Sequence, residues 1–132
     1  MDPQSPAFEA IVDQSPVSII LADRNGVIRV WNRASEALFG FAAGEVVGQS
    51  LDVIIPERLR ESHWRGFGSS LASGETKYAG KVMTTRATHK DGRKLYVEFS
   101  FAMLKDEEGR VTGALAAARD GTERFLAGRA VS

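Results

Sequence analysis

The sequence predicts an α+β fold, in which a five-stranded antiparallel sheet is covered on one face by short helices. The first observation is a hairpin signal followed at once by a helical one: β-branched residues flank turn formers at residues 23–26, and apolar residues then recur at helical spacing. The second observation is that three strand-like segments near the end of the chain are joined by turns too short for a parallel crossover. Between these two groups of strands the pattern indicates a block of short helices.

The opening hairpin is predicted over residues 19–30. Runs rich in β-branched residues flank Asn25 and Gly26, which tolerate the positive φ that a tight turn needs. A capped helix should follow directly, so the hairpin leads into a helix that folds back over it. Its candidate caps and apolar positions are Asn32 or Ser35 at the start, Gly40 at the end, and Ala34, Leu38 and Phe41 between them.

Residues 1–15 are expected to form a separate N-terminal helix. Ser5 and Pro6 suit the start of a helix, and Pro16 stops it because the residue before a proline avoids the helical region. The apolar residues on its one face are Phe8, Ile11 and Val12. So short a helix is not stable alone, so it should dock either on its own sheet or on a partner subunit.

Two further helical segments are predicted in the middle of the chain. Residues 42–47 are short and end at Gly48, whereas residues 58–71 show a longer amphipathic pattern. The stripe on that longer helix consists of Leu59, His63, Phe67 and Leu71. Gly66 and Gly68 each weaken it by about 1 kcal/mol relative to alanine, so close contact with another surface should compensate.

The last three strands are predicted at residues 78–88, 95–103 and 111–118. The middle strand alternates most clearly between apolar and polar positions, as a strand with one buried face does. Its apolar side consists of Leu95, Val97, Phe99 and Phe101. Turn formers at 90–93 and 106–110 separate the strands.

A family resemblance rests on four motifs in this order. The hairpin turn is D-R-N-G, followed by V-W-N and A-S-E-A-L-F-G; later come G-E-V-V-G-Q-S-L leading to I-P-E, then H-K-D-G-R, then R-D-G-T-E-R. Together they resemble a PAS domain from about residue 8 to about residue 124. The resemblance implies a sensory module at residues 16–124, with residues 125–132 starting a linker or signalling helix, and leaves the signal open.

Composition narrows the classes of function. The chain has 132 residues, enough for one domain, and equal counts of 17 basic and 17 acidic residues, so it lacks the basic excess of a nucleic-acid-binding domain. There is no cysteine, no apolar run near the roughly 20 residues of a membrane span, and no signal-peptide pattern. No nucleophile and base form a recognisable pair, and no phosphate-binding glycine loop is present. We therefore expect a soluble cytoplasmic module that is not an enzyme and binds neither nucleic acid nor membrane.

His63 is the residue with the most chemical potential. It shares a helical stripe with apolar residues, and a buried neutral imidazole needs a partner, which can be a backbone carbonyl, a water or a metal such as haem iron. The segment P-E-R-L-R-E-S-H is similar to the P-x-x-x-R-x-x-H context of the proximal histidine in haem-binding PAS gas sensors. Two positions differ from that pattern: Gly66 replaces an aromatic residue, with Phe67 one place on, and Met83 stands where some members have a gas-binding arginine.

A small-ligand pocket between helices and sheet is a second hypothesis. Its expected apolar lining is Ile54, Leu59, Phe67, Val82, Met83, Phe99, Phe101 and Leu115, and the same residues would equally form an ordinary filled core. Met83 would be either an iron ligand opposite His63 or a core residue. Flavin photochemistry and a coumaroyl chromophore of the PAS light sensors both require a cysteine, so neither is expected here, while haem b and a small organic ligand stay open and the cofactor is unknown.

The end of the chain resembles the D-I-T-E-R junction of PAS domains, with Gly121 in place of the usual isoleucine. The resemblance implies that Asp120, Thr122 and Arg124 join the sheet to an outgoing signalling helix, which Gly128 should cut short. Two functions stay open: a ligand or haem sensor in a histidine kinase, diguanylate cyclase-type or transcription regulator, or a cofactor-free platform that homodimerises through the N-terminal helix or the outer sheet face.

Overall fold

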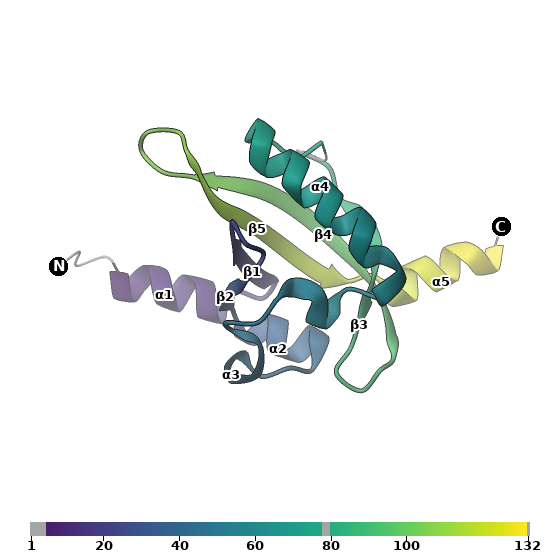
Figure 1. Ribbon diagram of the computed structural model, residues 1–132. Coiled ribbons are helices and arrows are strands. Elements are labelled where there is room, and N and C mark those ends of the chain that lie inside the picture. Colours follow the sequence, from purple (N-terminus) through teal and green to yellow (C-terminus); the bar gives the residue numbers. More distant parts are fainter. Residues whose placement is uncertain (1–4, 78–79, 132) are drawn as a thin grey trace.

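The computed structural model describes residues 5–77 and 80–131, and it confirms the α+β fold with a five-stranded antiparallel sheet and an N-terminal helix (Figure 1). The elements in chain order are α1 (Ser5–Gln14), β1 (Ser18–Asp23), β2 (Ile28–Trp31), α2 (Arg33–Phe39), α3 (Ala43–Val46), the 3₁₀ turns η1 (Leu51–Ile54) and η2 (Glu57–Leu59), α4 (Arg60–Ser73), β3 (Met83–Thr88), β4 (Lys94–Lys105), β5 (Val111–Asp120) and α5 (Thr122–Val131). The third strand was expected from residue 78, but residues 78–79 lie outside the described part and β3 begins at Met83.

The sheet has the strand order β2-β1-β5-β4-β3, so the first strand of the chain lies beside the last. All neighbouring strands are antiparallel. Ala116 of β5 lies opposite both Ile20 of β1 and Phe101 of β4, and its neighbour Leu115 lies opposite Leu21 and Ala102. Because successive side chains alternate between faces, these two rows of residues mark the two sides of the sheet.

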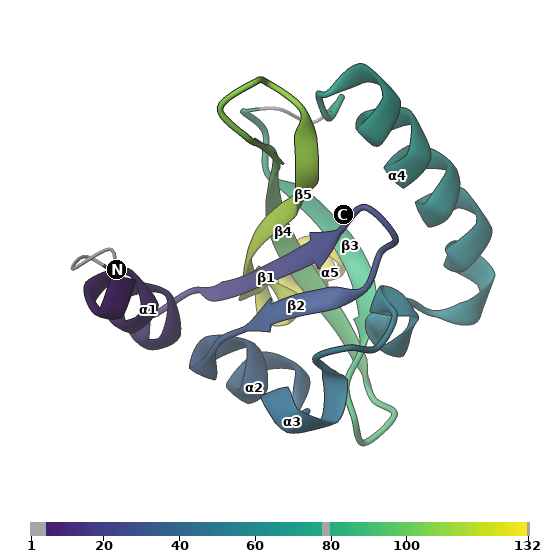
Figure 2. The same ribbon diagram turned by 60° about the vertical axis from the view of Figure 1, so that its left-hand side comes forward.

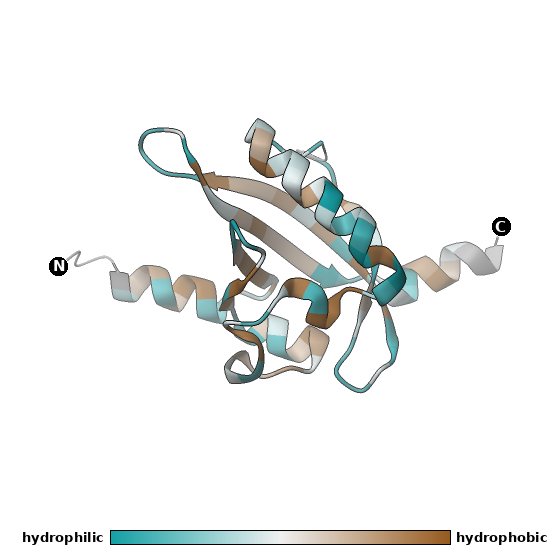
Figure 3. Cartoon of the chain, in the orientation of Figure 1, coloured by the Kyte–Doolittle hydropathy of each residue, from teal (hydrophilic) through white to brown (hydrophobic). Residues whose placement is uncertain are grey.

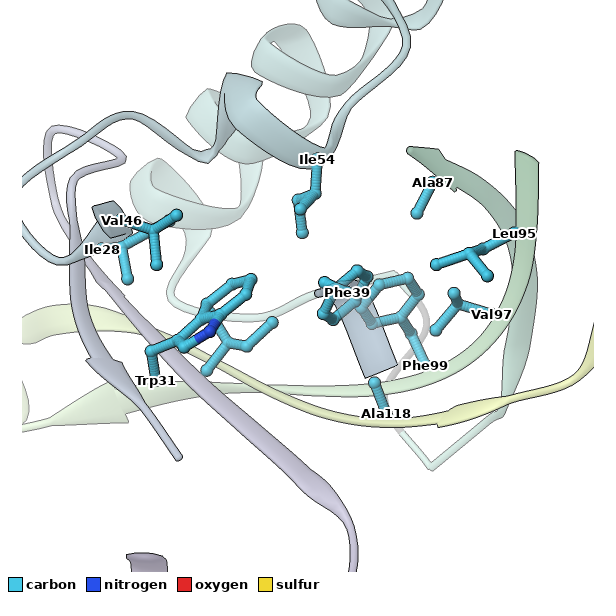
Figure 4. Close-up of a cluster of buried hydrophobic side chains, with 11 residues drawn as sticks. Ile28, Trp31, Phe39, Val46, Ile54, Ala87, Leu95, Val97, Phe99 and Ala118 are labelled. Carbon is cyan, nitrogen blue, oxygen red and sulfur yellow. The ribbon is translucent and has the colours of Figure 1, made fainter. Parts of the chain in front are cut away.

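One hydrophobic core fills the space between the sheet and α2, α3 and η1 (Figure 4). Its buried residues are Ile20, Ile28, Trp31, Phe39, Val46, Ile54, Ala87, Leu95, Val97, Phe99 and Ala118. Trp31 and Phe39 contact each other with ring centroids 5.3 Å apart, and the Trp31 indole donates to the Phe41 carbonyl. The alternation predicted for the middle strand is confirmed, since Leu95, Val97 and Phe99 are all buried.

Asn32 connects the hairpin to the helix that follows it. Its Oδ1 accepts hydrogen bonds from the backbone N–H of Ser35 and of Ile19, at 3.0 and 2.9 Å. Its Nδ2 donates to the carbonyls of Val12 and Val17 at 2.8 and 3.1 Å. The predicted cap is therefore confirmed, and the same side chain also fixes the end of α1 and the entry to β1.

The helix α1 extends beyond the sheet, on the opposite side of the molecule from α4 (Figure 2). Its C-terminal end is tied to α2, where Asp13 accepts from Arg33 at 2.7 Å. Phe8 and Ile11, however, are 54% and 65% exposed. Of the two docking surfaces expected from the sequence, its own sheet therefore does not cover the apolar face of α1.

The C-terminal helix α5 corrects one prediction. The sequence suggested that this helix is cut short around Gly128 or was never long, whereas α5 runs through Gly128 to Val131. Its first turn is held on β4, where Phe125 stacks on Tyr96 with ring centroids 3.9 Å apart and an interplanar angle of 11°. Tyr96 alternates with the buried Leu95 and Val97, so α5 lies on the face of the sheet opposite the core.

Apolar residues run along both β4 and β5, whereas α4 mixes apolar and polar positions (Figure 3). Within the described ranges, no helix is long and apolar enough to cross a membrane.

Candidate functional site

The helix α4 presents one half-buried face to the rest of the protein. Its half-buried residues recur at helical spacing, and no residue of the helix is fully buried. The face consists of Arg60, His63, Trp64, Phe67, Ser70 and Leu71. α4 overlaps β4 in Figure 1 but stands apart from the sheet in Figure 2, and this face contacts the β1–β2 turn and η1. It leaves the two glycines, Gly66 and Gly68, on the exposed side with nothing near them.

The first turns of α4 are fixed to the segment before it. The Trp64 indole Nε1 donates to Asp52 Oδ1 at 2.8 Å, and Arg60 donates to the carbonyls of Ile55 and Asp52 at 3.0 and 3.2 Å. The Trp64 ring also lies against Gly26 in the β1–β2 turn, because a Cβ added to Gly26 would be 2.3 Å from two of its ring carbons. Three separate elements therefore meet at Trp64.

His63 lies beside Trp64 on this face. Its ring centroid is 4.6 Å from that of Trp64, in an edge-on arrangement, and 6.0 Å from that of Phe67. The Nδ1 atom of His63 is buried and has no hydrogen-bond partner among the described residues. Burial lowers the pKa of the His63 imidazole, and the Asp52 carboxylate opposes this effect more weakly. Burial therefore favours the neutral imidazole, and its Nδ1 makes no hydrogen bond to a described residue.

The structure divides the predicted pocket residues into groups. Ile54 and Phe99 belong to the closed core, where Figure 4 shows Ile54 pointing into the cluster. Phe101 stacks on Phe99 at 5.3 Å and is only half-buried. Met83 shares the inner side of β3 with the buried Ala87, and Leu59 lies half-buried at the start of α4. These positions surround the inner sheet surface opposite α4.

Two of the expected lining residues lie elsewhere. Leu115 pairs with Leu21 and Ala102 on the outer face of the sheet, so it cannot line a pocket on the side of Phe101. Val82 precedes β3 and is 65% exposed. The sequence misplaced Leu115 because its strand is almost uniformly small and apolar, which leaves no alternation to show which face each residue occupies.

Two surface hollows are present in the described part of the structure. One, of about 740 Å³, lies between the end of α4 and the base of the β4–β5 hairpin, with Arg24 at its edge. The other, of about 430 Å³, is lined by the end of α1 and Pro16. Neither is lined by His63 or Met83, so the predicted ligand pocket is not one of these hollows.

The junction residues form a compact group at the start of α5. Asp120 Oδ1 accepts from the Thr122 N–H at 2.9 Å, and Thr122 Oγ1 accepts from the Tyr96 N–H, also at 2.9 Å. Arg124 donates to Glu98 Oε2 at 2.9 Å. The structure thus brings Asp120, Thr122 and Arg124 together against β4.

The comparisons with known proteins agree with this architecture. The family model described as PAS fold matches residues 7–121. The chain belongs to the PAS family. A solved PAS domain from Colwellia psychrerythraea superimposes with a TM-score of 0.77 at 25% identity, covering 92% of this chain and 99% of that one. The resemblance to a sensory PAS domain, stated from the sequence motifs, is confirmed.

Two curated relatives are sensors. The oxygen sensor protein DosP of Escherichia coli (strain K12) is 28% identical over 104 residues, which is 79% of this chain and 13% of DosP. The sensor protein FixL of Bradyrhizobium diazoefficiens is 33% identical over 56 residues, which is 42% of this chain and 11% of FixL. The PAS chain thus spans less than a fifth of the length of either relative.

Sequence reasoning missed the partners of the PAS helix α4. Asp52 and Trp64 belong to no local motif, and Gly26 was predicted only as part of the hairpin turn. Their association depends on how three elements meet in space. The one usable signal was the tight turn at Gly26, which gives a large side chain room to approach the backbone.

Proposed function

We propose that this PAS domain is a sensory module that detects a small molecule or gas through a haem held between α4 and the sheet, with His63 as the iron ligand. The observation that carries the proposal is the buried Nδ1 of His63, which has no hydrogen-bond partner in the described ranges, on a helix without a buried residue. A neutral imidazole is the form that binds iron, and burial favours that form by lowering the pKa of His63.

The surroundings of His63 fit a flat apolar group. On the opposite side, the inner sheet surface offers Met83, Phe101 and Met103, all apolar and all only half-buried. A bound group would cover these side chains and would separate α4 from β4 without disturbing the closed core. Bound haem would supply a reversible site for a diatomic gas, or a redox change, and a visible absorption band.

The relatives support the choice of haem over other ligands. DosP is named as an oxygen sensor, and the segment around His63 keeps the P-x-x-x-R-x-x-H pattern of PAS gas sensors. No cluster of three or more metal-binding side chains occurs among the described residues, so a single axial ligand to a prosthetic group suits this chain better than a metal ion held by protein groups alone.

The strand β4 would transmit the signal from the proposed site to α5. Phe99 of the core stacks on Phe101 at the proposed haem site, while its neighbour Glu98 faces outward and pairs with Arg124 of α5. A shift of β4 would therefore reach the junction formed by Asp120 and Thr122. Because this chain matches only a small part of its sensor relatives, we place it in a larger cytoplasmic signalling or transcription regulatory protein, such as a histidine kinase.

The experiment that tests this proposal is a visible absorption spectrum of the purified protein, before and after addition of haemin. We expect a Soret band that is lost in His63→Ala and kept in the matched control His89→Ala, which removes the other histidine of the chain. A colourless wild-type protein that takes up no haemin would contradict the proposal.

A homodimerisation platform is the second candidate function, and one observation favours it. The outer sheet face carries a row of apolar residues away from α5; they are Ile19, Leu21, Ala102, Leu115 and Ala117. The exposed apolar face of α1 lies next to the start of β1 in the same sheet. Both surfaces would be buried if two copies paired through them, with or without a cofactor.

A further inference from the structure

We propose that Trp64 is the positioning residue of His63, and that Gly26 is glycine in order to leave room for the Trp64 ring. The inference rests on the proposed function, because it concerns how the imidazole is aimed at its ligand. It adds a specific set of three residues, Gly26, Asp52 and Trp64, that control one side chain from three different elements.

The indole of Trp64 is fixed at both of its ends. Its Nε1 donates to Asp52 Oδ1 at 2.8 Å, and its six-membered ring lies over Gly26. Asp52 is itself held in place, since Ser50 Oγ accepts from the Asp52 N–H at 3.1 Å and Arg60 donates to the Asp52 carbonyl. An indole held by a hydrogen bond at one end and a backbone surface at the other has no freedom to rotate about χ1.

Gly26 cannot carry a side chain with Trp64 in this position. A Cβ on Gly26 would lie 2.3 Å from both Cη2 and Cζ3 of Trp64, a distance that requires one of the two groups to move. Gly26 also has φ +76°, where other residues are strained. Gly92, in the β3–β4 turn, has φ +91° and nothing within 4 Å of its added Cβ. Both glycines have a positive φ, but only at Gly26 does the added Cβ meet another side chain.

Trp64 in turn restricts His63. The two rings meet edge-on, with centroids 4.6 Å apart at 78°, and Phe67 contacts Trp64 in the same geometry at 5.3 Å. The neighbouring Trp64 ring thus limits the angle of the imidazole. Asp52 is the charged group that acts on His63 from outside α4, and Trp64 holds that carboxylate by hydrogen bonding.

The first arm of the test uses the protein without haem. Imidazole signals of the two histidines are followed by NMR through a pH titration, with His89 as the internal reference. We expect the pKa of His63 to rise toward its ordinary value in Gly26→Ala and in Trp64→Phe, because both leave the imidazole ring more exposed to water. Gly92→Ala and Trp31→Phe, which change a turn glycine and the other indole, should leave it unchanged.

The second arm measures haemin affinity. Loss of groups that orient a ligating histidine typically costs roughly 10- to 100-fold in affinity, and we expect this loss in Gly26→Ala and Trp64→Phe but not in Gly92→Ala or Trp31→Phe. Trp64→Phe keeps an aromatic ring, so it preserves the fold where Trp64→Ala does not.

The two arms separate the two claims. A wild-type protein without haemin uptake overturns the proposed function alone, and the NMR arm then still decides the role of Trp64. The role of Trp64 is overturned if the pKa of His63 is the same in Gly26→Ala as in Gly92→Ala, or if haemin binds Trp64→Phe as tightly as it binds wild type.

Discussion

Glu98 and Gly121 are in direct contact on the outer face of the sheet: a Cβ added to Gly121 would be 2.7 Å from Glu98 Cγ. The Glu98 side chain therefore occupies the space beside the glycine, and its carboxylate accepts from Arg124 at 2.9 Å. The glycine that replaces the usual isoleucine of this junction lies directly against this side chain. It makes room for a carboxylate that ties α5 to β4.

Gly121→Ala should detach the start of α5 from β4. The new Cβ would displace Glu98 and break its contact with Arg124, so we expect faster hydrogen exchange of the amides of α5 and a lower melting temperature. Gly128→Ala is the matched control, since no atom lies within 4 Å of its added Cβ and alanine favours the helix by about 1 kcal/mol. Equal exchange rates in the two variants would contradict the role of Glu98.

The ion pair itself should contribute little to stability. Arg124 is 78% exposed, whereas the Glu98 side chain is 10% exposed, so solvent screens the pair from one side. A double-mutant cycle with Glu98→Gln and Arg124→Gln, measured by urea unfolding, should give a coupling free energy below about 1 kcal/mol. A much larger coupling would show that the pair, rather than the Tyr96–Phe125 stack, holds α5 in place.

Asn32→Ala should be strongly destabilising. The side chain is 2% exposed and connects α1, β1 and α2, and its removal leaves buried N–H and C=O groups of three elements without partners. We expect a loss of about 3 kcal/mol in the free energy of unfolding, since each buried polar group left without a hydrogen-bond partner costs about 1 kcal/mol or more. Asn25→Ala, in the exposed β1–β2 turn, is the control and should cost much less.

Stability should depend on pH through His63. Burial lowers the pKa of this imidazole in the folded protein, so between that value and the ordinary 6.5 the unfolded chain binds a proton that the folded chain does not. Stability therefore rises with pH in this window, is complete above 6.5, and is lost as pH falls through the folded pKa.

The measurement is urea unfolding at about pH 5.5 and about pH 7.5 of wild type and His63→Leu. The difference in unfolding free energy between the two pH values should be smaller in the variant, because leucine does not titrate. His89 and the acidic residues are present in both proteins, so their contributions cancel. An unchanged difference would place the titrating group elsewhere.

Local signals in the sequence were sufficient for much of this fold. The turn at Gly26, the cap at Asn32 and the end of α2 at Gly40 each depend on a few neighbouring residues, and the structure has them as predicted. The alternation of β4 gave the inner face of the sheet for the same reason, because every second residue there is large and apolar.

Features that depend on tertiary contacts could not be predicted. The face occupied by Leu115 is set by the register between β4 and β5, which a run of small apolar residues does not reveal. The docking of α5 on the sheet depends on Phe125 meeting Tyr96, which lies far away in the sequence. The stripe of α4 correctly singled out His63, but the contact of its neighbour Trp64 with Gly26 joins distant segments.

Dimerisation through the outer sheet face can be tested by a single substitution that introduces a charged side chain. Leu115→Glu would place a carboxylate at the centre of the apolar row formed with Leu21 and Ala102, so we expect the dimer to weaken or vanish in sedimentation velocity. Val47→Glu is the control, because Val47 is an exposed apolar residue, 42% accessible, that lies after α3 and away from this face. A dimer that survives Leu115→Glu would exclude the outer face, and deletion of residues 1–14 would then test α1.

The most direct test of the central claim, that His63 binds a group between α4 and the sheet, is chemical rescue of His63→Gly. The glycine variant leaves a gap of imidazole shape beside Trp64, and free imidazole can occupy it and bind iron. We expect His63→Gly to lose the Soret band after haemin addition and to regain it when imidazole is supplied. A Soret band in the glycine variant without imidazole, equal to that of wild type, would contradict the account.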